Sequence, residues 1–397
     1  MLEEKGDCHR KPRIATKGMS PVTPVMGRRE LALEEKKRVA IIGLGVIGGS
    51  LGMALLAKGN YEVVGIDRDP VTVRLALETG AVSAGTTDCL NGVKQADIVV
   101  VAIPVGDLAD LAREIAPSIS SEAIVTDVGS TKAEVVAQLE EIFPSRFVGG
   151  HPMTGSERSG IEGAELYLFE NAIYVLTPTA RTDSEALQKI QEMVADTGAI
   201  SCFISPDDHD RIVAAISHLP HMMAVALMNL AADFSELHPQ ALTLAAGGFR
   251  DMTRIAASSQ VMWRDIFATN RRNVIELSRQ FREVLLHCEQ LLEREDYNEL
   301  VLFMQRACCE RQKIPFHLKG TLPTLYELIC TVPDRPGSIA LITGLLGEEE
   351  INISDLEILR IREGEGGTIR LGFKTEREVE RAFQVLCKAD IAVKRRR

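Results

Sequence analysis

The segment from Phe147 to Gly160, FVGGHPMTGSERSG, places a histidine in a setting that suits acid–base chemistry. Glycines and a proline surround His151, which predicts a loop directly after a short strand. In doubly wound sheets, functional groups gather where the strands end. A histidine at this place would lie near the nicotinamide ring of a bound dinucleotide, so we predict a catalytic role for His151.

A second polar side chain, Ser130, follows the apolar run AIVTDV at residues 123–128. It also stands at the C-terminal end of a predicted strand, so we expect it at the same edge of the sheet as His151. Ser130 is equally suited to cap a helix that begins at Thr131, and the two roles are compatible.

The stretch RVAIIGLGVIGGSLGMALL carries the glycine spacing Gly43-x-Gly45-x-x-Gly48 after an apolar run at residues 39–42. That spacing is typical of a strand, a tight turn and a helix from about Ser50 whose N-terminal N–H groups face a pyrophosphate. The contacts predicted for a dinucleotide are Gly43, Gly45, Val46, Ile47, Gly48, Asp67, Arg68, Ile103 and Pro104.

A membrane span is the main alternative for this stretch, because it has no charge between Arg38 and Lys58. A span needs ~20 apolar residues. Each of the interior glycines would cost a helix roughly 1 kcal/mol relative to alanine. We therefore interpret the stretch as a cofactor loop and expect no membrane partner.

Asp67 ends the next predicted strand, YEVVGID at residues 61–67. A carboxylate at this place accepts from the ribose 2′-hydroxyl and repels a 2′-phosphate. NAD is therefore the favoured cofactor, although Arg68 directly after it is able to accommodate a phosphate.

The whole chain must supply the elements that position these groups. Its 397 residues suffice for two or three domains, and 45% hydrophobic with 25% charged residues is typical of a soluble globular protein. The net charge of −11 argues against a nucleic-acid partner. The eight cysteines lack CxxC or metal-like spacing, which fits a reducing cytoplasm and no metal site.

Strand-like and helical segments alternate over residues 37–205, which predicts an α/β fold with a Rossmann-type dinucleotide-binding domain. Residues 206–314 carry apolar side chains at three-to-four spacing, which predicts an all-helical domain with a face that needs a partner. Residues 1–36 have no periodicity and are predicted to be disordered or an added extension.

A boundary that contains prolines and a glycine lies near residues 313–324. It precedes a final region at 325–397 with the order βαββαβ, the ferredoxin-like arrangement. The turn before its first helix is Asp334-Arg335-Pro336-Gly337. This region resembles an ACT domain, a module that commonly binds amino acids. A plain ferredoxin-like dimerisation module remains the alternative.

The segments GLGVIGGS, VVVAIP, TDVGSTK, GGHPMTGSERSG, ISHLPH, GGFRDMTRIA and MWRDIF follow one another in an order that resembles the prephenate dehydrogenase family. The resemblance covers residues 37–311. It implies oxidative decarboxylation of prephenate to 4-hydroxyphenylpyruvate, hydride transfer to NAD+ and a homodimer whose helices interlock. Tyrosine feedback through the ACT-like region is the expected regulation.

The same resemblance implies a role for several side chains. His151 accepts the proton of the ring hydroxyl, and Ser130 orients the same group. Arg254 binds a substrate carboxylate, for which a planar guanidinium is suited. His221 lies in the substrate pocket, His218 packs beside it, and Trp263 forms a wall. The remaining predicted substrate contacts are Arg250, Gly247, Ser156 and Glu157, the last of which gates the pocket.

Three other functions compete with this reading. An arogenate dehydrogenase would run the same chemistry on an amino side chain, and the sequence does not decide between the two. A non-catalytic NAD-binding amino-acid sensor is opposed by the joint presence of Ser130, His151 and Arg254. A β-hydroxyacid dehydrogenase would carry a lysine in HDRIVAAISHLPH, which has none.

Overall fold

The computed structural model describes residues 36–155, 158–314, 326–333, 335–359 and 367–396. The extension predicted for residues 1–36 therefore lies outside the described residues, except for Lys36. The same holds for Ser156 and Glu157 of the predicted substrate site and for Asp334 of the predicted regulatory turn.

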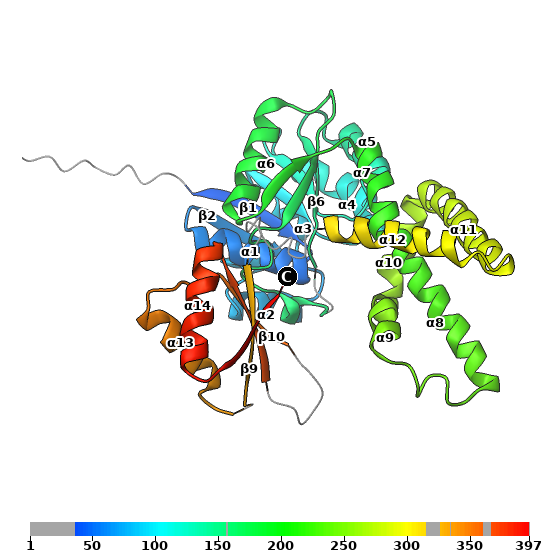
Figure 1. Ribbon diagram of the computed structural model, residues 1–397. Coiled ribbons are helices and arrows are strands. Elements are labelled where there is room, and N and C mark those ends of the chain that lie inside the picture. The colour runs from blue at the N-terminus through cyan, green and yellow to red at the C-terminus, as the bar shows by residue number, and fades with distance from the viewer. Residues whose placement is uncertain (1–35, 156–157, 315–325, 334, 360–366, 397) are drawn as a thin grey trace, which may run out of the picture. The chain divides into compact units, whose positions relative to one another are not determined.

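The first part of the chain forms an eight-stranded sheet in the order β3-β2-β1-β4-β5-β6-β7-β8 (Figure 1). Neighbouring strands from β3 to β6 are parallel, β7 is antiparallel to β6, and β8 is parallel to β7. The bounds are β1 Lys37–Ile42, β2 Tyr61–Ile66, β3 Ala84–Thr86, β4 Ile98–Val101, β5 Ile124–Asp127, β6 Phe147–Pro152, β7 Ile173–Thr177 and β8 Ile200–Phe203.

Helices cover both faces of this sheet, as the uninterrupted apolar sequences of its central strands require. One core cluster packs Leu51 and Leu55 of α1 (Val46–Lys58) and Ile190 of α6 (Ser184–Asp196) on one face. The other packs Ala112 of α4 (Leu108–Ile115) and Leu139 of α5 (Ala133–Ile142) on the opposite face. Shorter elements are α2 Pro70–Glu78, α3 Cys89–Gly92, η1 Val105–Asp107, η2 Ala116–Ser118 and η3 Ile161–Gly163.

This arrangement is the predicted Rossmann-type domain. Strands β1 and β4 are neighbours in the sheet although β2 and β3 lie between them in the chain. The chain therefore turns to opposite sides of the sheet at β1 and β4, and ligands of such folds bind at the carboxyl ends of these strands.

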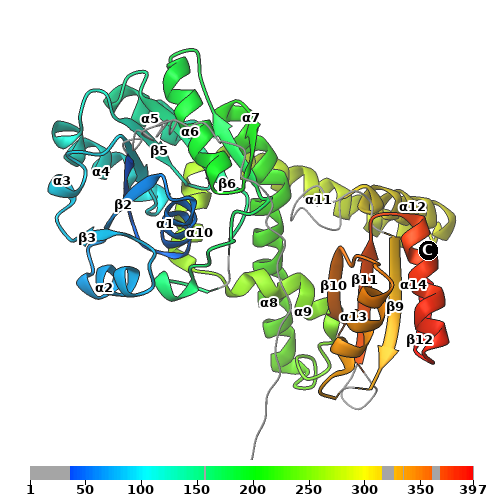
Figure 2. The ribbon, with the colours of Figure 1, turned by 90° about the vertical axis from the view of Figure 1, so that its left-hand side faces the viewer.

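Helices follow the sheet, and the first of them are joined into one rod (Figure 2). The bounds are α7 Pro206–Val213, a π-helical turn η4 Ala214–His218, α8 Leu219–Leu237, α9 Gly247–Thr253, η5 Arg254–Ala257, α10 Gln260–Thr269, α11 Arg271–Glu293 and α12 Tyr297–Lys313. Single π turns inside α-helices occur frequently at functional sites, and this one ends at His218.

The C-terminal region has the predicted order βαββαβ. Its elements are β9 Tyr326–Val332, α13 Ser338–Glu348, β10 Asp355–Leu359, β11 Gly367–Phe373, α14 Glu376–Lys388 and β12 Ala392–Arg396. The sheet order is β10-β11-β9-β12, and each neighbouring pair is antiparallel, as in a ferredoxin-like fold. Leu328, Ile342 and Leu386 belong to the core that joins the sheet to its helices.

Two local expectations were wrong. Helix α1 begins at Val46 and not near Ser50, so the third glycine of the loop already lies within the helix. His151 lies in β6 and not in a loop, paired with Val175 of β7. The preceding glycines serve close packing, because a Cβ at Gly150 would lie 2.6 Å from the carbonyl oxygen of Asp127.

Candidate active site

The glycine loop after β1 is tightly constrained at two of its three fingerprint positions. Gly43 has a φ of +93°, and a Cβ there would lie 2.4 Å from the carbonyl oxygen of Ala102. A Cβ at Gly48 would lie 2.0 Å from the carbonyl oxygen of Gly43. A Cβ at Gly45, by contrast, would meet no atom within 4 Å. Only Gly45 therefore keeps its side-chain position clear for an approaching ligand, as the second fingerprint glycine must for a pyrophosphate.

The start of α1 adds a favourable electrostatic environment for phosphate. Its N-cap, Gly45, offers no side-chain cap, and its first turn has no acidic residue. The helix N-terminus therefore leaves N–H groups and the positive end of the dipole for an anion. Asp67 borders this loop, where its carboxylate accepts from the backbone N–H of Leu44 at 2.9 Å and of Asp69 at 3.0 Å. Arg68 is exposed beside it.

Ile103 and Pro104 follow β4 and complete the surroundings of this loop. The Cγ2 atom of Ile103 would be 3.0 Å from a Cβ at Gly43, so its side chain packs on the loop itself. Val46 and Ile47 open α1. These residues fit a dinucleotide, with phosphate at the helix N-terminus and ribose hydroxyls at Asp67.

A cavity of about 340 Å³ lies where β6 and the loop after β5 meet the helical region. It brings together four of the residues that the sequence singled out, Ser130, His151, His218 and Trp263. The lining consists of Ser130, His151, Pro152, Met153, Thr154, Gly155, Ser217, His218, Met262, Trp263 and Ile266.

A chain of hydrogen bonds leads from His151 into the protein. Nδ1 of His151 lies 2.8 Å from Nε2 of His209, and Nδ1 of His209 lies 2.8 Å from Oδ1 of Asp210. His209 and Asp210 are both buried, in the second turn of α7. The sequence did not reveal either residue, because several aspartates close together near the start of a helix are typical of a solvated first turn.

Asp210 also replaces Ser130 as the cap of α5. Its carboxylate accepts from the backbone N–H of Lys132 at 2.7 Å and of Ala133 at 2.9 Å. The expectation that Ser130 caps this helix was wrong, because α5 begins only at Ala133 and its N-cap, Lys132, makes no side-chain cap. Ser130 instead lines the cavity.

A buried ion pair supports the backbone around the cavity. The ammonium of Lys132 contacts the carboxylate of Asp127, and both side chains are fully buried. Asp127 also accepts from the backbone N–H of Gly129 at 2.8 Å and of Gly150 at 3.2 Å. One carboxylate thus holds the residues that directly precede Ser130 and His151.

Burial keeps the imidazole of His151 neutral. Loss of water is the largest cause that lowers the pKa of His151 well below 6.5, followed by repulsion from His209, Lys132 and His218. Burial also lowers the pKa of His218 to about 4. The neutral form of His151, which can accept a proton, is therefore the form present at neutral pH.

The other predicted substrate residues lie in several places. His218 lines the cavity, and His221 lies one turn later with its ring stacked on Trp263 at a centroid distance of 3.5 Å. Gly247 and Arg250 lie on α9, and Arg254 opens η5. Among the described residues of the cavity lining, none of these three occurs.

Comparison with known proteins assigns the family. The family model "Prephenate dehydrogenase, nucleotide-binding domain" matches residues 51–202, and "Prephenate dehydrogenase, dimerization domain" matches residues 205–306. The prephenate dehydrogenase of Bacillus subtilis (strain 168) is 37% identical over 357 residues, which cover 88% of this chain and 96% of that protein. This chain belongs to the prephenate dehydrogenase family.

Solved structures agree with this assignment. Prephenate dehydrogenase from Aquifex aeolicus, in complex with hydroxyphenyl propionate and NAD+, has a TM-score of 0.67 at 35% identity and covers 70% of this chain and 98% of its own. Synechocystis arogenate dehydrogenase has a TM-score of 0.63 at 32% identity and covers 70% of this chain and 99% of its own. The chain is thus an oxidoreductase with a Rossmann-type nucleotide-binding domain and a helical dimerisation domain.

Proposed function

We propose that this enzyme oxidatively decarboxylates prephenate to 4-hydroxyphenylpyruvate with NAD+ as hydride acceptor. The observation that carries the proposal is the cavity that Ser130 and a partly buried, neutral His151 both line. The B. subtilis and A. aeolicus relatives bear the name prephenate dehydrogenase, and the latter was solved with NAD+.

In this mechanism His151 acts as the base. Its Nδ1 is engaged with His209, so Nε2 is the ring nitrogen available to a substrate. His151 accepts the proton of the C4 hydroxyl while the hydrogen at C4 departs with its electron pair, for which NAD+ supplies the acceptor. The bond from C1 to its carboxylate then breaks and carbon dioxide leaves. The electron pair of that bond completes the aromatic ring and returns negative charge to the C4 oxygen, which takes the proton back from His151. Ser130 hydrogen-bonds the hydroxyl region and orients it.

Prephenate is a dianion, so cationic side chains must meet it. We assign one carboxylate to Arg254, with Arg250 as a second cation and Gly247 allowing close approach of the backbone. His221, Ser156 and Glu157 remain proposed pocket residues. The turn at residues 334–337, which is proposed to bind an effector, contributes no residue to this substrate site.

An assay with two substrates and two cofactors tests the activity. Purified enzyme is supplied with prephenate or arogenate and with NAD+ or NADP+, and the absorbance of the reduced nicotinamide is followed. The proposal predicts the highest kcat/KM for prephenate with NAD+. Faster reduction with arogenate would favour the second candidate, which the likeness to Synechocystis arogenate dehydrogenase supports. No reduction with either substrate would refute both.

We further propose that the enzyme is a homodimer in the cytoplasm. The rod Pro206–Leu237 is long and apolar enough to cross a membrane by length and composition alone. Its first part, however, caps α5 through Asp210. Its far end carries exposed apolar side chains, among them Leu230 at 65% and Leu237 at 81% exposed. A second copy is the partner that the dimerisation-domain match supports.

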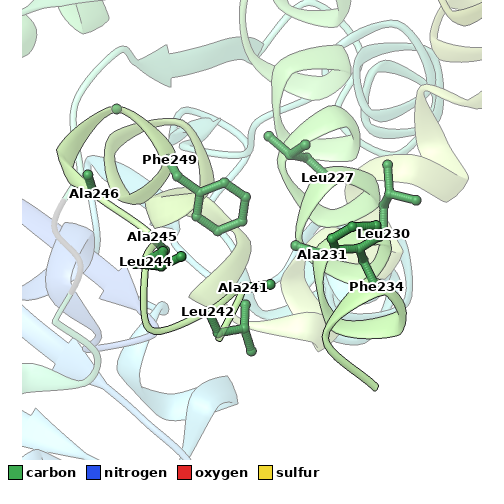
Figure 3. A pocket seen from close by; sticks show the side chains of 11 residues that line it. Leu227, Leu230, Ala231, Phe234, Ala241, Leu242, Leu244, Ala245, Ala246 and Phe249 are labelled. Carbon is green, nitrogen blue, oxygen red and sulfur yellow. The ribbon is translucent and has the colours of Figure 1, made fainter. Parts of the chain in front are cut away.

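The shape of this far end fits a protein partner. A hollow of about 550 Å³ lies between α8 and the segment that leads into α9, and Figure 3 shows side chains of both walls facing it. Leu227, Leu230 and Phe234 line one wall, and Leu242 and Phe249 line the other. Contiguous exposed apolar side chains mark interaction sites, and homodimer interfaces are more apolar than the rest of a protein surface. Light scattering of the wild type and of Leu230→Glu tests this, with a dimer expected for the first and a smaller species for the second.

We propose that the C-terminal region is an ACT domain through which tyrosine inhibits the enzyme. The ferredoxin-like order of β9 to β12 supports this, as does the B. subtilis relative, whose likeness covers more of this chain than residues 36–314 can supply. The proposed ligand turn contains Asp334, Arg335, Pro336 and Gly337. Gly337 has a φ of +93° and caps α13, and a helix N-terminus suits an amino-acid carboxylate.

Removal of the C-terminal region distinguishes regulation by tyrosine from direct competition of tyrosine, which resembles the product, at the active site. A chain ending at Ile314 is expected to stay active and to lose most of its sensitivity to tyrosine, because the effector acts only if it favours one arrangement of the enzyme. Weak competition by tyrosine at the active site should survive in both chains. Equal inhibition of both would leave the region as a dimerisation module.

A further inference from the structure

The hydrogen-bond chain behind His151 has a direction that the chemistry of its members determines. An ionised carboxylate only accepts, so the Nδ1 of His209, at 2.8 Å from Asp210, must carry a hydrogen. A neutral His209 then has a bare Nε2, which must accept. The hydrogen between the two imidazoles therefore belongs to Nδ1 of His151. This leaves Nε2 of His151 without a hydrogen, which is the form a base requires.

The geometry points to Asp210 as a positioning residue that, through His209, determines which ring nitrogen of His151 carries the hydrogen. Asp210 is not among the residues that line the cavity, and its hydrogen-bond link to His151 runs through His209. Its carboxylate is held by two backbone N–H groups at the start of α5. Because those donors fix both carboxylate oxygens, Asp210 cannot rotate away from His209. The inference rests on the proposed function for its kinetic part only.

The same chain provides a route for charge after proton uptake. When Nε2 of His151 accepts the substrate proton, the hydrogen on Nδ1 can pass to Nε2 of His209. The positive charge then lies on the ring that faces Asp210. The ionisable groups around the two imidazoles are Asp210 on α7, Lys132 and Asp127 on either side of the loop after β5, and His218 on the π turn. Asp210 is the carboxylate in direct contact with His209.

Asparagine at position 210 tests this without a change in size. The amide NH2 of Asp210→Asn can face Nδ1 of His209, which would move its hydrogen to Nε2 and place the hydrogen of His151 on the wrong nitrogen. In serine proteases the equivalent change lowers kcat by ~10⁴. We expect kcat of Asp210→Asn to fall by on the order of 10²–10⁴, with KM for prephenate and Kd for NAD+ within about threefold. Asp207→Asn, an exposed neighbour on the same helix, is the matched control and should behave as wild type.

His209→Asn separates positioning from the structural cap. It removes the link to His151 but leaves Asp210 free to cap α5, so Tm should fall less for His209→Asn than for Asp210→Asn, which also disturbs the cap. Because Asp210 acts on His151 through His209, the losses of kcat in Asp210→Asn and His209→Asn should not multiply. The double variant should be no slower than the slower single variant. A normal kcat in His209→Asn, or losses that multiply, would overturn the proposal.

Nuclear magnetic resonance gives a readout that does not depend on substrate. With ¹⁵N-histidine labelling and without prephenate, the wild type should show His151 with a protonated Nδ1 and a bare Nε2, and Asp210→Asn should show the reverse or a mixture. The wild type with its hydrogen on Nε2 of His151 would refute the assignment. This result stands even if the enzyme oxidises a different substrate, so the two proposals can fail separately.

Discussion

Lowering the pH should reduce the free energy of unfolding through protonation of His218, and the structure allows the size of this loss to be worked out. His218 is 1% exposed, and its Nδ1 lies 3.1 Å from the amide nitrogen of Asn270. The same amide nitrogen donates to the carbonyl of Asp210 at 2.8 Å, and the amide oxygen of Asn270 accepts from Asn273, so the orientation of the amide is fixed. A proton added at Nδ1 of His218 would face another donor.

Burial and this opposing donor both favour neutral His218, whose pKa falls from 6.5 to about 4. The unfolded chain takes up the proton below about pH 6.5, whereas the folded chain does so only below about pH 4. The contribution of neutral His218 to the free energy of unfolding is therefore fully present above pH 6.5 and is lost as the pH falls from about 6.5 to about 4. With about 1.4 kcal/mol for each pKa unit, the loss from pH 8 to pH 5 is about 2 kcal/mol.

Urea unfolding at pH 8 and pH 5 measures this loss at a fixed protein concentration. The fluorescence of Trp263, the single tryptophan, reports on this region because its ring contacts that of His218. His218→Gln should lose about 2 kcal/mol less than wild type over the same interval, and His238→Gln, at an exposed position, should match wild type. An equal loss in wild type and His218→Gln would refute the reasoning.

Further variants test the cofactor and substrate sites. Gly45→Ala should keep the wild-type Tm but raise the Kd for NAD+ at least about tenfold, roughly 1.4 kcal/mol in binding free energy. Gly48→Ala should also lower Tm, because its Cβ would lie 2.0 Å from a backbone oxygen. Calorimetry measures Kd and thermal melts measure Tm, and a normal Kd for Gly45→Ala would contradict the loop assignment. Asp67→Ala should lower the ratio of kcat/KM with NAD+ to kcat/KM with NADP+, because the carboxylate that repels the 2′-phosphate is gone. An unchanged ratio would show that Asp67 does not determine the choice of cofactor. Arg254→Ala should raise KM for prephenate while kcat changes less, because a carboxylate clamp holds ground and transition states alike; an unchanged KM would place Arg254 outside the pocket.

The sequence was sufficient for the parts of the site that depend on local pattern. The apolar run before Gly43 and the glycine spacing predicted a strand, a turn and a helix, because these constraints act between residues close in the chain. Ser130 and His151 were both predicted at strand ends, and the parallel order of β5 and β6 brings them to one edge.

Other parts depend on contacts between distant segments and left no local signal. Asp210 caps a helix that begins 77 residues earlier in the chain, so no capping pattern near α5 could reveal it. Gly149 and Gly150 suggested a loop, but in the structure they allow β6 to pass close to its neighbours. The same glycine composition serves both purposes, and only the packing distinguishes them.

The central claim is that His151 is the base for oxidation of prephenate, and the turnover of His151→Asn tests it most directly. Steady-state reduction of NAD+ by prephenate is compared with wild type, and calorimetry measures the affinity for NAD+ in both. Asparagine keeps a polar side chain in β6 but cannot take the proton. We predict an unchanged Kd for NAD+ and a kcat lower by on the order of 10²–10⁴. A kcat within about threefold of wild type at equal Kd would contradict the assignment of His151 as the base.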